Sequence, residues 1–343
     1  MAYSNVGTPV FYVDNYLYHK TIGTTLTVGI PADVYNMKPQ IATTVDANFV
    51  IQLPVSPINY NLYGNMKYYI AFLNHNIFTS ANSENTTQTF FTDDNDVQVY
   101  SDFDIVVGAL NPYQFESGSS IITTNTAHDT SSYNLNNVVG FNLGAVSTGI
   151  QYTMPHSPDL NLNMEIEFDG VKTITTSGGS SISNVRYTGN PLWTNEGNKT
   201  NPFDVYETSL DVTTTGARRN GRKSWSLKFS YVSDSDLFSS NPGASSYTEH
   251  PNDSTYETSD LDGLDATGSP ISTSYLGFNI DTDDSFYAQV WNKTLGGALP
   301  FIFQPDSNHR DDFYICKFDQ KSLKIEQSAY KVYDISLKIV EAW

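Results

Sequence analysis

A scarcity of cysteine and of positive charge limits what this chain can be. Its 343 residues include one cysteine, Cys316, so an intrachain disulfide is excluded. Because Cys316 lies in a stretch typical of a strand, we expect a small buried hydrophobe rather than a reactive thiol. The 18 Lys and Arg stand against 37 Asp and Glu, a formal net charge of −19 that excludes nucleic acid and anionic membrane as expected partners.

Long apolar runs are also missing. No stretch is long enough to cross a bilayer, and residues 1–14 lack the basic and apolar regions of a signal peptide. We therefore expect no membrane span.

The sequence has no motif of a common hydrolase or nucleotide enzyme: no Gly-x-Ser-x-Gly elbow, phosphate loop or dinucleotide fingerprint. Its acids gather in runs such as residues 93–96 and 281–284, which we interpret as solvated turns or helix caps rather than paired catalytic carboxylates. In residues 260–265 the side-chain oxygens are spaced as in a calcium-binding loop, but the twelve-residue pattern of such a loop is missing. The six histidines are dispersed and have no metal-ligand spacing. We expect no enzyme activity, catalytic residue, cofactor or metal.

What is abundant is Asn, Thr, Ser and Tyr, which favour strands and turns over helices. Three segments alternate apolar and polar residues with the period of two that is typical of a half-buried strand. The apolar members are Met164, Ile166 and Phe168; Trp225, Leu227, Phe229 and Tyr231; and Tyr333, Ile335, Leu337 and Ile339. Burying such side chains contributes roughly 1.5–3 kcal/mol each, which is enough to fix the strand register.

The length fits two β units behind an N-terminal arm. Residues 1–40 form the arm, whose tyrosines are expected to pack either on the first unit or on a neighbouring subunit. Residues 41–158 contain short expected strands at 48–53, 66–73, 89–92, 97–100, 104–110, 137–143 and 149–155, separated by turns such as 118–120. This spacing predicts a β-sandwich or jelly roll.

Two passages in residues 41–158 resemble the galactose-binding-like jelly roll of carbohydrate-binding modules. One is the strand at residues 68–73 running into Asn74, His75 and Asn76, and the other is the strand at 149–154. The resemblance implies a sugar site in loops at one end of the sandwich, with Asn74, His75 and Asn76 as candidate glycan contacts. A purely structural hydrogen-bonding role for His75 is the alternative.

Residues 159–343 form the second unit. An Asp169–Gly170 turn predicts a hairpin between residues 163–169 and 170–176. Ser233 and Asp234 predict the cap of a short helix, and a second helix is expected at residues 285–294, ended by Gly296 and Gly297. Residues 239–274 are a long polar insertion.

A basic loop at residues 217–223 precedes the Trp225 strand, with cations at Arg218, Arg219, Arg222 and Lys223. One interpretation is a solvated hairpin loop. Another is a contact with acidic surface on a neighbouring subunit, since the guanidinium fork pairs with carboxylates in two-pronged fashion. Nucleic-acid binding is the third and conflicts with the net charge.

The order of parts after residue 159 resembles a tail-protein domain of tailed bacteriophages: basic loop, Trp-containing strand, helix, Pro-Phe-Ile-Phe-Gln-Pro, Ile-Cys-Lys-Phe, and a closing strand ending in Glu-Ala-Trp. Minor and distal tail proteins of this kind have a tail-tube-like β-barrel packed by one helix. The resemblance implies a non-enzymatic virion protein, a ring or adaptor at the distal tail. Its expected partners are copies of itself, other tail proteins and host-surface glycan. The alternative is a lectin-like surface protein, and a glycosidase is a third hypothesis.

Overall fold

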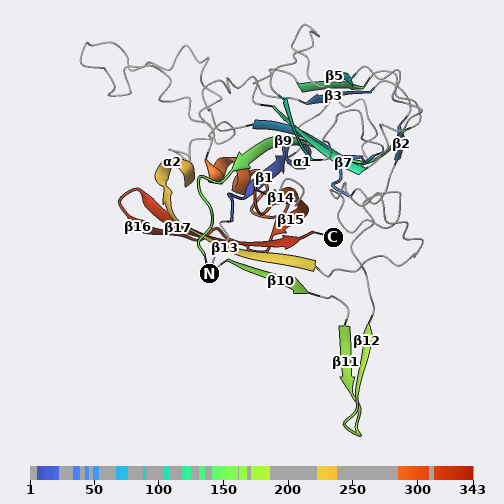
Figure 1. Cartoon of the computed structure of the whole chain (residues 1–343), viewed down its shortest axis with the longest axis vertical. Coiled ribbons are helices and arrows are strands. Elements are labelled where there is room, and N and C mark those ends of the chain that lie inside the picture. The colour runs from blue at the N-terminus through green and yellow to red at the C-terminus, as the bar shows by residue number, and fades with distance from the viewer. Residues whose placement is uncertain are drawn as a thin grey trace.

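The computed structural model describes residues 6–22, 34–38, 43–45, 49–53, 67–75, 88–89, 103–107, 118–124, 131–135, 141–160, 162–167, 171–185, 222–237, 285–308 and 313–342. These residues form a mainly β structure dominated by one large antiparallel sheet (Figure 1). The predicted mainly β fold class is confirmed.

Twelve of the described strands belong to the large sheet. Ten follow one path: β10 (Asn163–Glu167), β13 (Arg222–Ser233), β17 (Val332–Glu341), β15 (Tyr314–Phe318), β14 (Phe301–Gln304), β1 (Val10–Asp14), β9 (Phe141–Thr153), β4 (Lys67–His75), β7 (Gly118–Thr124) and β6 (Phe103–Val107). Outside this path, β16 (Ile325–Ala329) pairs with β17, and β2 (Thr43–Val45) pairs with β9. The described strands β3 (Phe49–Leu53), β8 (Ser131–Leu135) and β5 (Gln88–Thr89) form a second sheet, and β11 (Val171–Thr175) and β12 (Ser181–Val185) form a third.

The strand β1 lies at the centre of the large sheet, between β9 and β14. All five of its residues are buried. Phe11 and Val13 belong to one hydrophobic core, while Val10 and Tyr12 belong to another. Because side chains alternate across a strand, β1 supplies both cores, one from each face.

The N-terminal segment predicted as an arm thus contributes a central strand. Tyr16, Tyr18 and Tyr35 are buried against this same chain, and the rings of Tyr16 and Tyr35 stack with centres 4.0 Å apart. β1 also joins strands of residues 41–158 to strands of residues 159–343 in one sheet. The division into two units at residue 158 stays a prediction.

The alternating pattern of the two longest C-terminal strands is confirmed. β13 and β17 pair so that Trp225 faces Ile339 and Leu227 faces Leu337, and all four side chains are buried. Aromatic rings from distant segments complete this core. Phe11 lies 5.2 Å from Phe303 between ring centres. Cys316 is buried in β15 within the same cluster, as predicted.

Tyr231 does not continue the buried stripe of β13. The pairing with β17 shifts between Phe229 and Val232, which marks a β-bulge. The bulge places Val232 in the core, while Tyr231 adopts a φ of 67° and is 77% exposed. The prediction that Tyr231 is buried was therefore wrong, because one extra residue in the ladder reverses the alternation.

The predicted hairpin at Asp169–Gly170 is wrong as well. β10 pairs with β13, whereas β11 pairs with β12 around a different turn at Ser177–Ser180. Residues 163–167 of the predicted stripe form the strand β10, in which Met164 and Ile166 are about half exposed, while Phe168 lies outside the described residues. Long-range pairing with the Trp225 strand overrides the local turn preference.

In residues 41–158 the strands at 137–143 and 149–155 are parts of one strand, β9, which runs through residue 153. Residues 118–120, predicted as a turn, begin β7, which pairs with β4. The predicted strands at 48–53 and 66–73 are confirmed with small shifts at their ends, and the strand predicted at 104–110 is confirmed up to residue 107, beyond which residues 108–110 lie outside the described residues.

Helices are short in the described residues. α1 (Asn15–Thr21) follows β1 and is capped by Asp14, which accepts the backbone N–H of Leu17 at 2.9 Å. α2 (Asp234–Leu237) is capped by Ser233 as predicted. The helix expected at 285–294 is present as a π-helix, Tyr287–Asn292, and buries Val290. Within the described ranges, no helix has the length and apolar character needed to cross a bilayer.

Candidate assembly surface

The basic residues predicted before the Trp225 strand are only partly described. Arg218 and Arg219 lie outside the described residues. Arg222 and Lys223 are the first two residues of β13, where they pair with Glu167 and Ile166 of β10. The prediction that these two residues lie in a loop was wrong. Pairing with β10 moves the start of the strand back from residue 224 to residue 222.

Lys223 makes contacts within the chain. Its ammonium group donates to the hydroxyl of Tyr314 at 2.6 Å and lies 4.3 Å from the centre of that ring. Its backbone N–H donates to the carboxylate of Glu341 at 3.1 Å. Tyr314 in turn packs against Trp225, with ring centres 4.9 Å apart. Lys223 therefore links β13 to β15 and β17, and the role of the four basic residues in subunit contact stays a prediction.

The candidate glycan residues lie at the far end of β4. Asn74 and His75 are its last two residues, and His75 pairs with Gly118 of β7 and Leu143 of β9. Asn76 lies outside the described residues. The predicted strand thus continues for two residues, which places Asn74 and His75 in the sheet. Their contact with glycan stays a prediction.

The strand β10 forms one end of the large sheet (Figure 1). In the part of the chain that the structure describes, it has a partner strand on one side, β13. All five of its residues are exposed, including Met164 at 49% and Ile166 at 47%. Such an open edge offers unpaired backbone groups to another chain.

The hairpin β11–β12 follows β10 in sequence and projects away from the sheet (Figure 1). Two backbone hydrogen bonds help to close its turn: Thr176 N–H donates to Ser180 O at 2.8 Å, and Gly179 N–H donates to Thr176 O at 2.9 Å. Gly179 has a φ of 81°, which glycine adopts without a steric penalty. The register places Ile174 opposite Ile182, and both side chains are more than half exposed.

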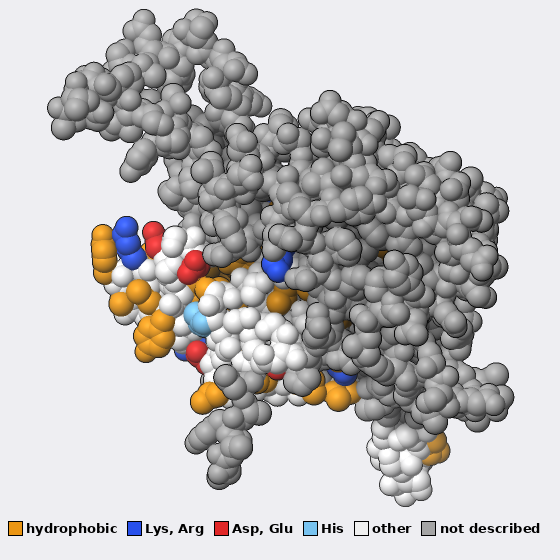
Figure 2. Space-filling view, turned by 45° about the horizontal axis from the view of Figure 1, so that its top comes forward, with side chains coloured by type: hydrophobic (Ala, Val, Ile, Leu, Met, Phe, Trp, Pro, Cys, Tyr) orange, Lys and Arg blue, Asp and Glu red, His pale blue; other side chains and the backbone are white. Residues whose placement is uncertain are grey.

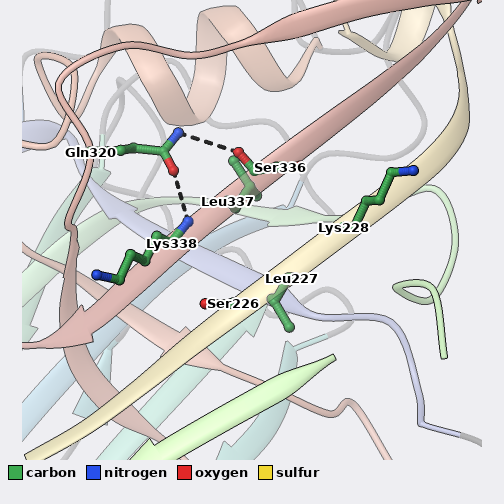
Figure 3. Close-up of a pocket in the computed structure, with 7 residues that line it drawn as sticks. All are labelled: Ser226, Leu227, Lys228, Gln320, Ser336, Leu337 and Lys338. Carbon is green, nitrogen blue, oxygen red and sulfur yellow. Dashed lines mark hydrogen bonds between the residues drawn. The ribbon is translucent and has the colours of Figure 1, made fainter. Parts of the chain in front are cut away.

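A shallow groove of about 240 Å³ lies on the polar side of β13 and β17 (Figure 3). It is lined by Ser226, Leu227, Lys228, Gln320, Ser336, Leu337 and Lys338. Lys228 pairs with Asp334 at 3.5 Å and Lys338 pairs with Asp319 at 2.8 Å. Asp319 holds the pKa of the Lys338 ammonium above its usual value, first through their hydrogen bond and then through charge attraction. These pairs neutralise charges beside the groove.

The carboxyl of Asp14 is buried beside the start of α1. Burial raises its pKa to about 6, while hydrogen bonds from Leu17, Ser147, Tyr16 and Thr148 act in the opposite direction. Asp14 is 3% exposed, so it is closed to substrates. Among the described residues no cluster of three potential metal ligands exists, and the candidate calcium segment at 260–265 lies outside them.

The apolar pair Ile174–Ile182 was missed at the level of sequence. Residues 171–176 and 180–185 each alternate in character, and the Gly178–Gly179 dipeptide between them favours a turn. Because Asp169–Gly170 is a stronger turn pattern, the hairpin was predicted there, which was the wrong position. The edge strand β10 and the hairpin each carry two exposed apolar side chains. No protein-family model, no curated protein and no solved structure gives a significant match to this chain.

Proposed function

We propose that this chain is a structural protein of a tailed-phage virion, a ring or adaptor component of the distal tail. In this proposal residues 159–343 form a tail-tube-like β-barrel with one packed helix and assemble with copies of themselves. Residues 41–158 form a jelly roll that faces outward and contacts host glycan. The chemistry is assembly rather than catalysis.

The observation that carries the proposal is that the segments behind the resemblance pack on a single core. They are far apart in sequence, and each contributes a buried side chain: Trp225 from β13, Phe286 beside the π-helix, Phe301 and Phe303 from β14, Cys316 and Phe318 from β15, and Ile339 from β17. Phe301 and Phe318 lie 4.8 Å apart between ring centres, and Trp225 and Phe303 lie 5.6 Å apart. An ordered set of motifs that builds one core is stronger support than the motifs taken singly.

The open edge of β10 and the exposed hairpin give further support. An edge strand with exposed apolar side chains can pair with another chain, which would cover these side chains. The formal net charge of −19 keeps copies apart unless specific contacts overcome the repulsion. The basic residues of the segment that leads into β13 in the sequence, from Arg218 to Lys223, are suited to such contacts.

The test is the mass of the purified full chain. Light scattering is expected to give an integral multiple of 38.1 kDa, and negative-stain images are expected to show closed rings. Reversing the charge at Arg219 and Arg222 is expected to weaken ring formation while the monomer stays folded by circular dichroism. A chain that remains monomeric at all concentrations would contradict the proposal, and intact rings in the double variant would contradict the role of these arginines.

A lectin-like surface protein is the second candidate, and one observation favours it. Tyr231 is 77% exposed and Tyr330 is 84% exposed. Exposed aromatic rings with polar tips are suited to stacking on sugar rings. Binding of the monomer to a glycan array, lost in Tyr231→Ala or Tyr330→Ala, would favour this function over assembly.

A further inference from the structure

The hairpin β11–β12 is a two-stranded sheet that stands by itself among the described strands. From Thr173 to Ser183 its residues are exposed, with Thr176 half-buried. Figure 2 shows this hairpin as a projection at the lower right with a small apolar patch on one side. A lone two-stranded hairpin is marginally stable in water, and packing against another element is what stabilises it.

The two faces of the hairpin differ in chemistry. Ile174 and Ile182 are cross-strand partners and share one face, where they are 59% and 57% exposed. Thr173 and Ser183 share the other face, and their hydroxyl groups are joined by a 3.1 Å hydrogen bond. Between Thr173 and Ser183, the isoleucine face is therefore the one that gains by being covered with apolar surface.

The hairpin also differs in charge from the rest of the chain. Residues 171–185 contain Lys172 and no Asp or Glu, in a protein with 37 acids and 18 bases. An acid-free arm can approach the acidic surface of another copy without the repulsion that the whole molecule imposes.

The edge strand β10 carries the complementary features. Met164 and Ile166 are about half exposed, and they alternate with the carboxylates of Glu165 and Glu167. Within the chain β10 pairs with β13 and the hairpin strands pair with each other, so the two surfaces are not joined in one copy. Matching surfaces that differ on the same chain lead to head-to-tail association, which closes a ring when the rotation allows it.

We infer that the hairpin β11–β12 is a docking arm for a second copy of this chain, and that its Ile174–Ile182 face seats on the β10 edge of that neighbour. The inference rests on the proposed assembly function and names the two surfaces through which neighbouring copies bind each other.

Cysteine crosslinking of the full chain tests this contact, since the natural Cys316 is buried and does not compete. Ile174→Cys and Ile166→Cys are prepared as separate proteins, mixed and oxidised, and disulfide-linked dimers are measured on non-reducing gels. The matched control is Thr173→Cys, on the hydroxyl face of the same hairpin, mixed with Ile166→Cys. We expect dimers from the Ile174 mixture and only background from the control. Equal crosslinking in both mixtures, or none in either, would overturn the inference.

A second measurement does not depend on a disulfide. Ile174→Asp with Ile182→Asp is expected to raise the dissociation constant between copies by about tenfold or more, because two apolar contacts are lost. Thr173→Asp with Ser183→Asp adds the same charge on the other face and is expected to have a smaller effect. Both variants should unfold at the same temperature as the wild type, since the hairpin lies outside the large sheet.

The outcomes separate this inference from the proposed function. Oligomers that form normally in the double isoleucine variant would refute the docking arm and leave assembly standing. A wild-type chain that is monomeric at every concentration would remove both.

Discussion

The side-chain amide of Gln320 takes the place of a neighbouring strand beside Lys338. Its Oε1 accepts the backbone N–H of Lys338 at 2.7 Å, and its Nε2 donates to the carbonyl of Ser336 at 3.4 Å (Figure 3). β16 pairs with β17 up to Ile335, and β15 pairs with it from Ile339 onward. Gln320 therefore satisfies the backbone of β17 in the gap between two partner strands.

Gln320→Ala is expected to lower the free energy of unfolding by about 0.5–1.5 kcal/mol, because the bonds to the β17 backbone are lost in a site that water can reach. Urea denaturation measures the change, and amide exchange at Lys338 should accelerate. Gln327→Ala, at an exposed position of β16, serves as the control and is expected to cost less. Equal losses in both variants would contradict the role of Gln320.

The buried carboxyl of Asp14 predicts a pH-dependent stability. Its pKa is about 6 in the folded chain, above the ordinary value of 3.8, so the folded state holds the proton more tightly than the unfolded state. The resulting stabilisation is complete below pH 3.8 and is lost as the pH rises through 6. Its size is about 3 kcal/mol.

Asp14→Asn is expected to remove this contribution, since the amide does not titrate. The difference in unfolding free energy between wild type and variant should shift by about 2.5 kcal/mol between pH 4 and pH 7, in favour of the variant at the higher pH. Thermal unfolding at matched ionic strength measures it. Parallel pH profiles for the two proteins would show that Asp14 ionises normally in the folded chain.

The pair Lys223–Tyr314 is expected to stabilise the corner where β13, β15 and β17 meet. Lys223→Met keeps the aliphatic stem and removes the donor, and Tyr314→Phe keeps the ring and removes the acceptor. Each is expected to cost about 1 kcal/mol, and the double variant should cost less than the sum, because both remove the same 2.6 Å bond. Strict additivity in a double-mutant cycle would mean that the bond contributes nothing.

Gly149 lies where β9 passes close to β1. A Cβ atom at this position would lie 2.0 Å from the carbonyl oxygen of Val13 and 2.7 Å from the backbone nitrogen of Asn15. Gly149→Ala is therefore expected to destabilise the chain by about 3 kcal/mol or more, since backbone atoms must move in a packed core.

Gly178 in the hairpin turn gives the matched control. A Cβ atom there would meet nothing within 4 Å, so Gly178→Ala should change the stability by less than about 0.5 kcal/mol. Thermal unfolding of the two variants makes the comparison, and a mild effect at Gly149 would show that β1 and β9 separate easily.

The sequence by itself determined the elements whose information is local. The period-two alternation of Trp225, Leu227 and Phe229, and of Ile335, Leu337 and Ile339, was sufficient to predict two strands and their buried faces. Ser233 was sufficient to predict the start of α2, and the position of Cys316 in an apolar stretch was sufficient to predict its burial. In each case a side-chain pattern over a few residues specifies the structure.

Only the tertiary structure decided which strands pair and which faces stay uncovered. β1 enters the centre of the sheet by pairing with residues more than one hundred positions away, and nothing in residues 10–14 specifies those partners. The alternating pattern assigned Met164 and Ile166 to one face of β10. A face becomes buried only when another element packs on it, and none of the described elements covers this face at the end of the sheet. The position of the exposed hairpin likewise followed from the pairing of β10 with β13, because hydrogen bonds between distant strands outweigh the preference of a single turn.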